Sequence, residues 1–249
     1  MSLTLPPSWK FGSARGLPIA LALALVFAAM RAAGTLAPAH WRWLLPLSFV
    51  CMAAGPWLLL SSQGRQQIGL VRPMRYAWFA PSIALGALAA FACFALGNIA
   101  FGSSEDNWFV SIARNYRDTI PHQGFTTLQL FLMATVPALL FSPIGEEIFF
   151  RGLLQRALEE RFSLRASTWI EALFFGLVHL CHHGLLATSA GIRLLPLSGA
   201  LWVALMFCVA LMFAWLRHRS GSLLPAMAAH ASFNLAMNVC IFAALWPVH

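Results

Sequence analysis

The chain has 249 residues, of which 60% are hydrophobic and only 10% are charged, and its mean hydropathy is +0.74. Soluble globular domains carry about 45–50% apolar and about 25% charged residues, so this composition excludes that class and predicts an integral membrane protein. The formal net charge of +8 would suggest a nucleic-acid partner in a soluble chain. In a membrane protein the arginines are expected in the loops instead, and no nucleic-acid partner is predicted.

Several apolar runs are each long enough, at about 20 residues per span, to cross a bilayer as helices. Helices are the only open-chain structure that satisfies every backbone hydrogen bond in lipid. In chain order the runs are 17–33, 43–60, 77–101, 125–142, 166–183, 196–216 and 223–245. The sequence therefore predicts an all-α polytopic membrane bundle of seven transmembrane helices, with eight as the alternative count. Residues 1–249 are expected to form a single integral membrane domain, in which the polar connection 102–124 is a loop or surface helix.

The basic residues are divided unevenly between the two ends of the predicted spans. With seven spans, the N-terminus and alternate loops carry Lys10, Arg15, Arg65, Arg72, Arg75, Arg151, Arg156, Arg161, Arg165, Arg217 and Arg219. The opposite side carries Arg31, Arg42, Arg114, Arg117 and Arg193. By the positive-inside rule the N-terminus is expected in the cytoplasm, and the short loops favour a bacterial inner (plasma) membrane.

The stretch 139–154, LLFSPIGEEIFFRGLL, places Glu146, Glu147 and Arg151 inside an otherwise apolar run. Inserting an ionisable side chain at bilayer depth costs about 2.5–3.5 kcal/mol even on the lenient scale, so such residues indicate function by default. Glu147 and Arg151 are spaced i, i+4 with the glutamate first, which is the favourable order for an ion pair. Glu146 points about 100° away and is expected to find its partner on another helix. A purely structural polar cluster is the competing interpretation, weaker for Glu146 than for the other two.

Two later segments offer polar partners for Glu146. FGLVH contains Phe175 and, one turn later, His179; HASFN contains His230 and Asn234 on one face of a helix. Counting at 1.5 Å per residue from the arginine-rich end of each helix places Glu146, His179 and His230 at about 22, 21 and 16 Å, so the three share a level. A lone buried histidine is usually an interhelical donor. Two histidines, an asparagine and a glutamate on three helices instead favour a catalytic cluster.

Two local expectations accompany this cluster. A helix running unbroken from 125 to 160 would exceed one membrane thickness, so Pro143 and Gly145 are expected to break or tilt it. Glu171 lies about 80° round the helix from His179 and is expected to make a polar contact on the cytoplasmic side.

At these residues the sequence resembles the CAAX prenyl protease and bacteriocin-processing (CPBP, or Abi) intramembrane endopeptidases, a family that includes the Ras-converting CAAX endopeptidases. Three family motifs are matched in the family's order: EExxxR by EEIFFR, FxxxH by FGLVH, and the histidine–asparagine pair by HASFN. The resemblance implies a catalytic core within 125–245.

The resemblance also implies the activity and the roles of the motif residues. Glu146 and His179 would activate a water that hydrolyses a peptide bond, while His230 and Asn234 would stabilise the oxyanion; Glu147 and Arg151 complete the first motif. A carboxylate base and N–H donors aimed at the oxyanion suit this chemistry. The wider family is associated with prenylated CAAX proteins, leader peptides and C-terminal sorting tails. The expected partners are therefore the lipid bilayer and a peptide or protein substrate with a membrane-associated or lipidated terminus.

Two alternatives stay open. No cofactor is favoured, but zinc could be bound by Glu146, His179 and His230 with Glu147 as the base, and His183 lies i+4 from His179. The alternative from another class is a non-catalytic membrane immunity or assembly factor, or a transporter. A transporter should show two related halves, whereas the polar residues here lie in the second half. An inactive relative should have lost a motif residue, and none is missing.

Overall fold

The computed structural model of the protein describes residues 9–10, 15–120, 123–188 and 191–246, and every structural statement below concerns those residues. The ends of the predicted 1–249 domain and part of the 102–124 connection lie outside them. Within these ranges seven helical segments are long and apolar enough to span a membrane, which confirms the predicted number. They are Gly16–Leu36, Ala39–Leu59, Tyr76–Phe101, Thr127–Leu158, Leu164–Cys181, Pro196–Ser220 and Leu224–Leu245.

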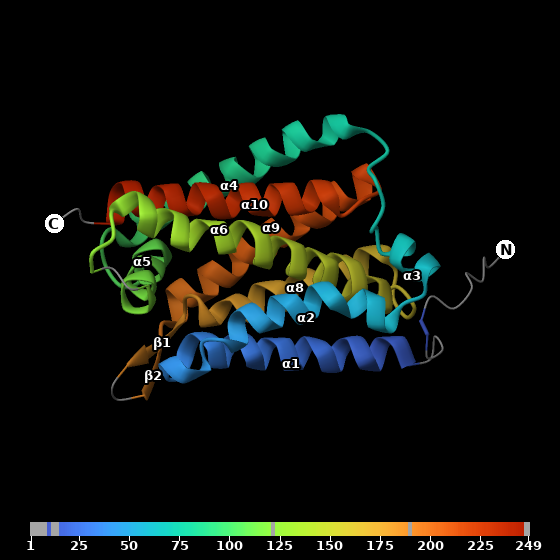
Figure 1. The fold of residues 1–249 in the computed structure, drawn as a ribbon, viewed down its shortest axis with the longest axis horizontal. Helices are drawn as coiled ribbons and strands as arrows, with labels where there is room; N and C mark the ends of the chain where they lie inside the picture. Colours follow the sequence, from blue (N-terminus) through green and yellow to red (C-terminus); the bar gives the residue numbers. More distant parts are fainter. Residues whose placement is uncertain (1–8, 11–14, 121–122, 189–190, 247–249) are drawn as a thin grey trace.

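The segments run side by side along the long axis of the molecule (Figure 1). The α-helices are α1 Gly16–Leu36, α2 Leu44–Leu59, α3 Ser62–Gln67, α4 Phe79–Phe101, α5 Trp108–Thr119, α6 Thr127–Glu146, α7 Gln155–Leu158, α8 Leu164–Val178, α9 Pro196–Ser220 and α10 Leu224–Cys240. Short 3₁₀ turns are η2 Ala39–Trp41, η3 Tyr76–Trp78 and η5 His179–Cys181, and π-helical segments are η4 Glu147–Leu154 and η6 Ile241–Leu245. Strands β1 Leu185–Thr188 and β2 Gly191–Leu194 form one antiparallel hairpin.

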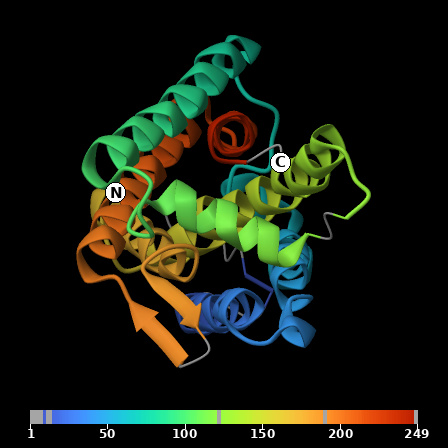
Figure 2. The ribbon, with the colours of Figure 1, turned by 90° about the vertical axis from the view of Figure 1, so that its left-hand side faces the viewer.

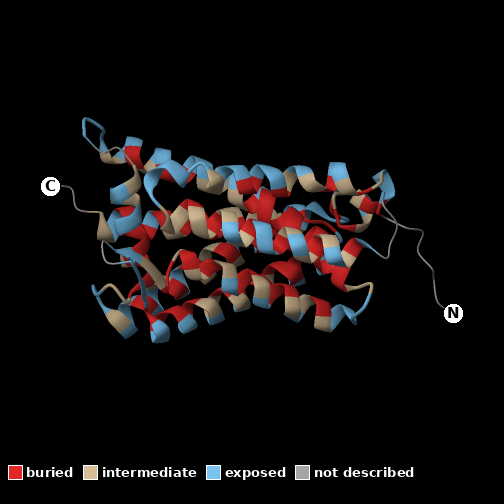
Figure 3. Cartoon of the chain, turned by 90° about the horizontal axis from the view of Figure 1, so that it is seen from below, coloured by how far each residue is buried: buried red, intermediate tan, exposed pale blue. Residues whose placement is uncertain are grey.

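Helix α10 lies among α4, α6 and α9, while α1 and α2 pack against the other side of the α6 and η4 region. Many large apolar side chains face outward, among them Leu25, Leu88, Ile99 and Leu128, which are all more than 60% exposed. Figure 3 shows the exposed positions along the outward faces of the helices. A water-facing surface would not carry so many large apolar side chains, so this exterior suits lipid. The arrangement is a polytopic helical bundle, as the composition predicted.

Glycines allow two pairs of helices to approach closely. A Cβ added at Gly145 of α6 would lie 2.5 Å from the backbone oxygen of Phe49 in α2, and one at Gly86 of α4 would lie 2.0 Å from that of Ala229 in α10. Small residues at helix contacts are the usual means of tight packing in membranes. The position of α6, which ends at Glu146, is therefore fixed by backbone contact with α2.

The helix that carries the EExxxR motif continues through Pro143 and Gly145, so of the predicted break or tilt the break does not occur. α6 begins at a capping box formed by Thr126 and Gln129 and runs to Glu146. The irregularity follows directly afterwards, because the next turns, η4, are π-helical and all eight of their residues are buried. π-helical turns inside α-helices are uncommon and often occur at functional sites.

One end of the bundle is covered by α5 and the β1–β2 hairpin, as Figure 2 shows from that end. The Asn107 side chain caps α5 by accepting a hydrogen bond from Phe109 N at 3.0 Å. Tyr116 donates a hydrogen bond to Asn238 of α10 at 2.9 Å. The connection that was expected to be a loop or surface helix therefore contains a helix, and that helix is held against the bundle.

Candidate active site

The motif residues lie at the centre of the bundle and come from three segments. Glu146 ends α6 and is followed by Glu147 and Arg151 in η4; Phe175 and His179 lie in α8 and η5; His230 and Asn234 lie in α10. Each of them is less than 9% exposed. Glu146, His179 and His230, which the count of residues along each helix placed at a similar depth, therefore lie in one region of the structure.

Glu146 forms a buried ion pair with Arg31 of α1. Both side chains are 1% exposed, and the Ser142 hydroxyl donates a further hydrogen bond to Glu146 Oε1 at 3.2 Å. The other oxygen, Oε2, has no hydrogen-bond partner among the described residues. Glu146 thus finds its partner on another helix, as predicted, but that helix is α1 and not one of the two later segments. Arg31, assigned from the sequence to a loop, is inside α1, because that helix continues to Leu36.

Arg31 also reaches a histidine that the motifs do not include. Its Nη2 lies 3.3 Å from His182 Nε2, and since guanidinium nitrogens only donate, this imidazole nitrogen accepts. The rings of His182 and His179 are 5.2 Å apart. Arg31 therefore links Glu146 to the histidines of the α8–β1 connection.

The second glutamate belongs to a separate buried network. Glu147 Oε1 lies 3.3 Å from Arg151 Nη1, which confirms the predicted ion pair, and 2.8 Å from His230 Nδ1. Arg151 Nε lies 3.6 Å from Glu171 Oε1, and its guanidinium carbon is 4.0 Å from the centroid of the Phe175 ring. The two carboxylates and the guanidinium are all 0% exposed. Glu171 thus makes a polar contact, as expected, and that contact is a buried ion pair with Arg151.

Hydrogen bonds fix the orientation of both motif histidines. His179 Nδ1 lies 2.6 Å from the Phe175 carbonyl, which only accepts, so Nδ1 carries hydrogen and Nε2 of the neutral ring has a lone pair. His230 Nδ1 faces the Glu147 carboxylate and donates in the same way. Its Nε2 lies 3.4 Å from the Ser142 hydroxyl, and its ring stacks on Phe213 at 4.9 Å. Each ring therefore keeps Nε2 available for chemistry.

Asn234 holds α10 against α6, because its Nδ2 donates to the Ala138 carbonyl at 2.9 Å. This bond uses one of the two amide hydrogens, so a second remains to be donated.

His183 is turned away from His179. The α-helix ends at Val178, and after the η5 turn His183 is 0% exposed, with Nδ1 2.9 Å from the Ser111 hydroxyl of α5. Burial lowers the pKa of His183 to about 4. The i+4 spacing that suggested a ligand pair assumed a continuous helix. Among the described residues no three His, Cys, Asp or Glu side chains are grouped to hold a metal ion.

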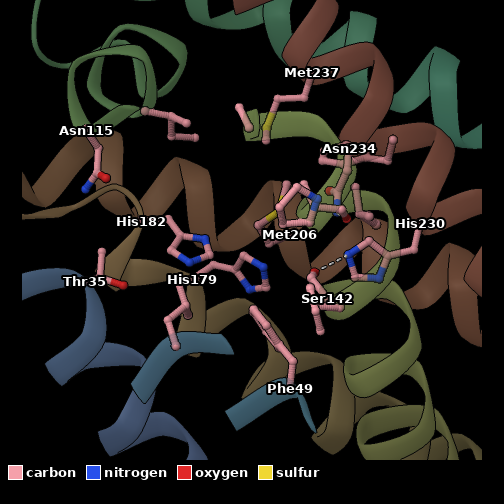
Figure 4. A pocket seen from close by; sticks show the side chains of 18 of the residues that line it. Thr35, Phe49, Asn115, Ser142, His179, His182, Met206, His230, Asn234 and Met237 are labelled. Atoms are coloured by element: carbon pink, nitrogen blue, oxygen red, sulfur yellow. Dashed lines mark hydrogen bonds between the residues drawn. The ribbon is translucent and has the colours of Figure 1, made fainter. Parts of the chain in front are cut away.

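The cluster borders a cavity of about 370 Å³, which is within the usual range for ligand pockets. Figure 4 shows Ser142, His179, His182, His230 and Asn234 around it. Most of the remaining lining is apolar and comes from α2, α5, α6, α9 and α10. Glu146 is not part of the lining; it lies directly behind Ser142. A polar group of serine, histidine and asparagine side chains thus meets an apolar chamber inside the membrane region.

Residues 127–236, from α6 into α10, match the family model of type II CAAX prenyl endopeptidase Rce1-like proteins. No curated protein and no solved structure matches the chain. This part of the chain is an Rce1-like domain of the CAAX protease family, which confirms the family resemblance. Together with the membrane helices, it supports a CAAX-type intramembrane protease.

Sequence reasoning missed three polar residues of the site: Arg31, Ser142 and His182. Arg31 also lies outside the segment that matches the family. Its position near the end of an apolar run could have suggested a buried arginine, since a depth count like that used for Glu146 applies to α1 as well. Ser142 lies one turn before Glu146, a spacing that could have suggested their contact.

Proposed function

We propose that the protein is an intramembrane endopeptidase that hydrolyses a peptide bond near a membrane-associated substrate terminus, using water activated by glutamate and histidine. The observation that carries this proposal is the convergence of Glu146, His179, His230 and Asn234 beside one cavity, with Nε2 of both histidines available. The substrate would be a peptide or protein with a membrane-associated or lipidated terminus. The expected location is a bacterial inner membrane, with the N-terminus in the cytoplasm.

In the proposed reaction, water attacks the carbonyl carbon of the scissile bond and loses a proton toward Glu146 and His179. His179 lines the cavity and its Nε2 can accept a proton, and Glu146 Oε2 has no hydrogen-bond partner among the described residues. As the carbon–nitrogen bond breaks, the same groups return the proton to the leaving amine. General base catalysis of this kind typically contributes about 10²–10⁴-fold in rate.

His230 and Asn234 would donate hydrogen bonds to the oxyanion. Because His230 Nδ1–H already donates to Glu147, Nε2 can donate only when the ring is an imidazolium. The Glu147 carboxylate holds the ring through Nδ1 and is itself paired with Arg151. Glu147 and Arg151 would therefore position the oxyanion donor rather than attack the substrate.

The zinc-dependent version fits these side chains poorly. It requires Glu146, His179 and His230 as ligands, yet the Arg31 guanidinium occupies Glu146 Oε1 and would repel a dication. Zinc analysis of the purified protein tests this point. We expect well under one zinc per chain, and cleavage that persists after treatment with EDTA or phenanthroline. Stoichiometric zinc that is lost in His179→Ala and His230→Ala, with cleavage restored by added zinc, would overturn the metal-free mechanism.

The experiment that tests the function compares peptide termini in membranes that contain the wild-type protein, His179→Ala or His40→Ala. His40 is an exposed histidine that does not line the cavity, and it serves as the matched control. We expect new membrane-protein termini with the wild type and His40→Ala that disappear with His179→Ala. Identical termini in all three membranes would contradict proteolysis at this site and would favour a non-catalytic immunity or assembly factor, or a transporter.

A further inference from the structure

The two ends of the bundle differ in charge. Around α3, the α7–α8 connection and the α9–α10 connection lie Arg65, Arg72, Arg75, Arg161, Arg165 and Arg219, together with Lys10 and Arg15. We call this the arginine-rich end. At the opposite end, formed by η2, α5 and the β1–β2 hairpin, the basic residues are Arg42, Arg114, Arg117 and Arg193. We call this the hairpin end (Figures 1 and 2). The positive-inside rule places the arginine-rich end in the cytoplasm.

The catalytic cavity extends toward the hairpin end. Its lining begins at Ser142 and His230 and reaches Thr35, Asn115 and His182. Those last three residues also line a second, more polar cavity of about 170 Å³. Arg42, Arg114 and Asp118 and residues of β1 complete this second cavity, which therefore forms a vestibule at the hairpin end.

The opposite direction is closed by packed side chains. All eight residues of η4, which follows Glu146 toward the arginine-rich end, are buried. Further along, Arg217 of α9 is 7% exposed, with Nη1 3.8 Å from Glu159 Oε1. The lining of both cavities includes no described residue of the loops at the arginine-rich end.

We infer that the substrate reaches the site from the extracytoplasmic face of the membrane. This inference rests on the proposed function, because it concerns the substrate of the same site. The route runs from a vestibule with arginines and an aspartate into an apolar chamber. It suits a polypeptide whose apolar segment enters the membrane beside the scissile bond while a polar flank stays at the outer surface. The leader or tail segment of an exported or membrane-anchored protein has that form. A protein carrying its lipid at the cytoplasmic surface would approach the closed end.

Single cysteines can test the direction of access without any measurement of activity. The chain has five free cysteines, Cys51, Cys93, Cys181, Cys208 and Cys240, which are first replaced. One cysteine is then placed at Asn115 in the vestibule, at Met206 inside the main cavity, or at Arg219 at the opposite end. Met206 is 2% exposed, so a reagent can reach it only through the cavity. The probe is a membrane-impermeant methanethiosulfonate applied to right-side-out and inside-out vesicles.

We expect Asn115→Cys and, more slowly, Met206→Cys to react in right-side-out vesicles, and Arg219→Cys to react only in inside-out vesicles. Reaction of Met206→Cys from the side that labels Arg219→Cys would overturn the inference. So would labelling of Asn115→Cys from the cytoplasmic side, or no reaction of Met206→Cys from either side. If labelling follows the expectation while the termini do not depend on His179, the proposed function fails and the direction of access stands.

The new termini of membrane proteins, compared between wild type and His179→Ala, provide a second test of the substrate class. Cleavage sites that depend on His179 should map to the extracytoplasmic end of a membrane segment. Sites that map to the cytoplasmic end would overturn the inference while leaving proteolysis itself supported.

Discussion

The Arg31–Glu146 pair is the residue-scale feature that most affects the electrostatics of the site. Both side chains are 1% exposed, so each charge depends on the other for compensation. Removing one partner of a buried pair typically costs about 3–5 kcal/mol, whereas replacing both by well-packed hydrophobic residues of similar volume is often neutral or stabilising. Loss of cleavage in a Glu146 variant therefore has to be separated from loss of folding.

Glu147→Gln should affect stability at least as strongly as turnover. The change removes the charge that compensates Arg151 and weakens the acceptor for His230 Nδ1. We expect the free energy of unfolding to fall by about 3–5 kcal/mol. Glu105→Gln is the matched control: Glu105 is 38% exposed beside Arg114 and Arg193, and such surface pairs contribute about 0–1 kcal/mol. Thermal unfolding in detergent measures the stability of both variants. Normal stability of Glu147→Gln with complete loss of cleavage would mean that the two glutamates have exchanged roles.

Ser142→Ala tests the contact between the cavity and Glu146. The hydroxyl donates to Glu146 Oε1 at 3.2 Å and lies 3.4 Å from His230 Nε2. Removing one hydrogen bond of about 1 kcal/mol should slow cleavage roughly fivefold with little change in stability. Ser48→Ala is the control, because that buried hydroxyl bonds only within its own helix, to Leu45 O at 2.6 Å. Equal rates for the two variants would remove Ser142 from the mechanism.

At the scale of helices, close packing of α6 on α2 fixes the depth of Glu146. Gly145→Ala would place a Cβ 2.5 Å from the backbone oxygen of Phe49, which cannot rotate away, so the helices must separate. We expect a loss of about 1–3 kcal/mol in stability and a slower cleavage rate. Gly55→Ala in α2 is the control, since its Cβ would meet nothing within 4 Å and should be neutral or stabilising by up to about 1 kcal/mol. A Gly145→Ala variant as stable as Gly55→Ala would contradict the packing.

The spans could be predicted from hydropathy because each must supply a long apolar helix to the bilayer. Hydropathy does not describe where a continuous helix changes its winding. The sequence therefore predicted a break or tilt at Pro143 and Gly145, whereas the irregularity is the π-helical segment η4 that follows them. The same limit applies at the end of α8. FGLVHLCHHG reads as one helix, but the chain turns after Val178 and directs His183 toward Ser111. Motif spacing placed the histidines at a common depth, while the partners of Glu146 depended on tertiary contacts.

At the scale of the whole molecule, the candidate site is larger than the domain that matches the family. Residues 127–236 contain all three motifs. Arg31 from α1, Phe49 from α2 and Asn115 from α5 supply the counter-charge of Glu146 and part of the cavity wall. The first half of the chain, which the sequence presented only as additional spans, is therefore part of the site.

The most direct test of the proposed mechanism is cleavage by a variant that keeps the fold but lacks the carboxylate. Arg31→Met/Glu146→Leu replaces both charges of the pair by apolar side chains, so we expect its free energy of unfolding to lie within about 1 kcal/mol of wild type, unlike either single variant. The rate is measured on a membrane peptide identified from the termini comparison. The mechanism predicts that the double variant loses at least about 10²-fold in rate, while Arg31→Gln, which keeps the carboxylate, retains measurable cleavage. A folded double variant that cleaves at the wild-type rate would contradict the role of Glu146 as the general base.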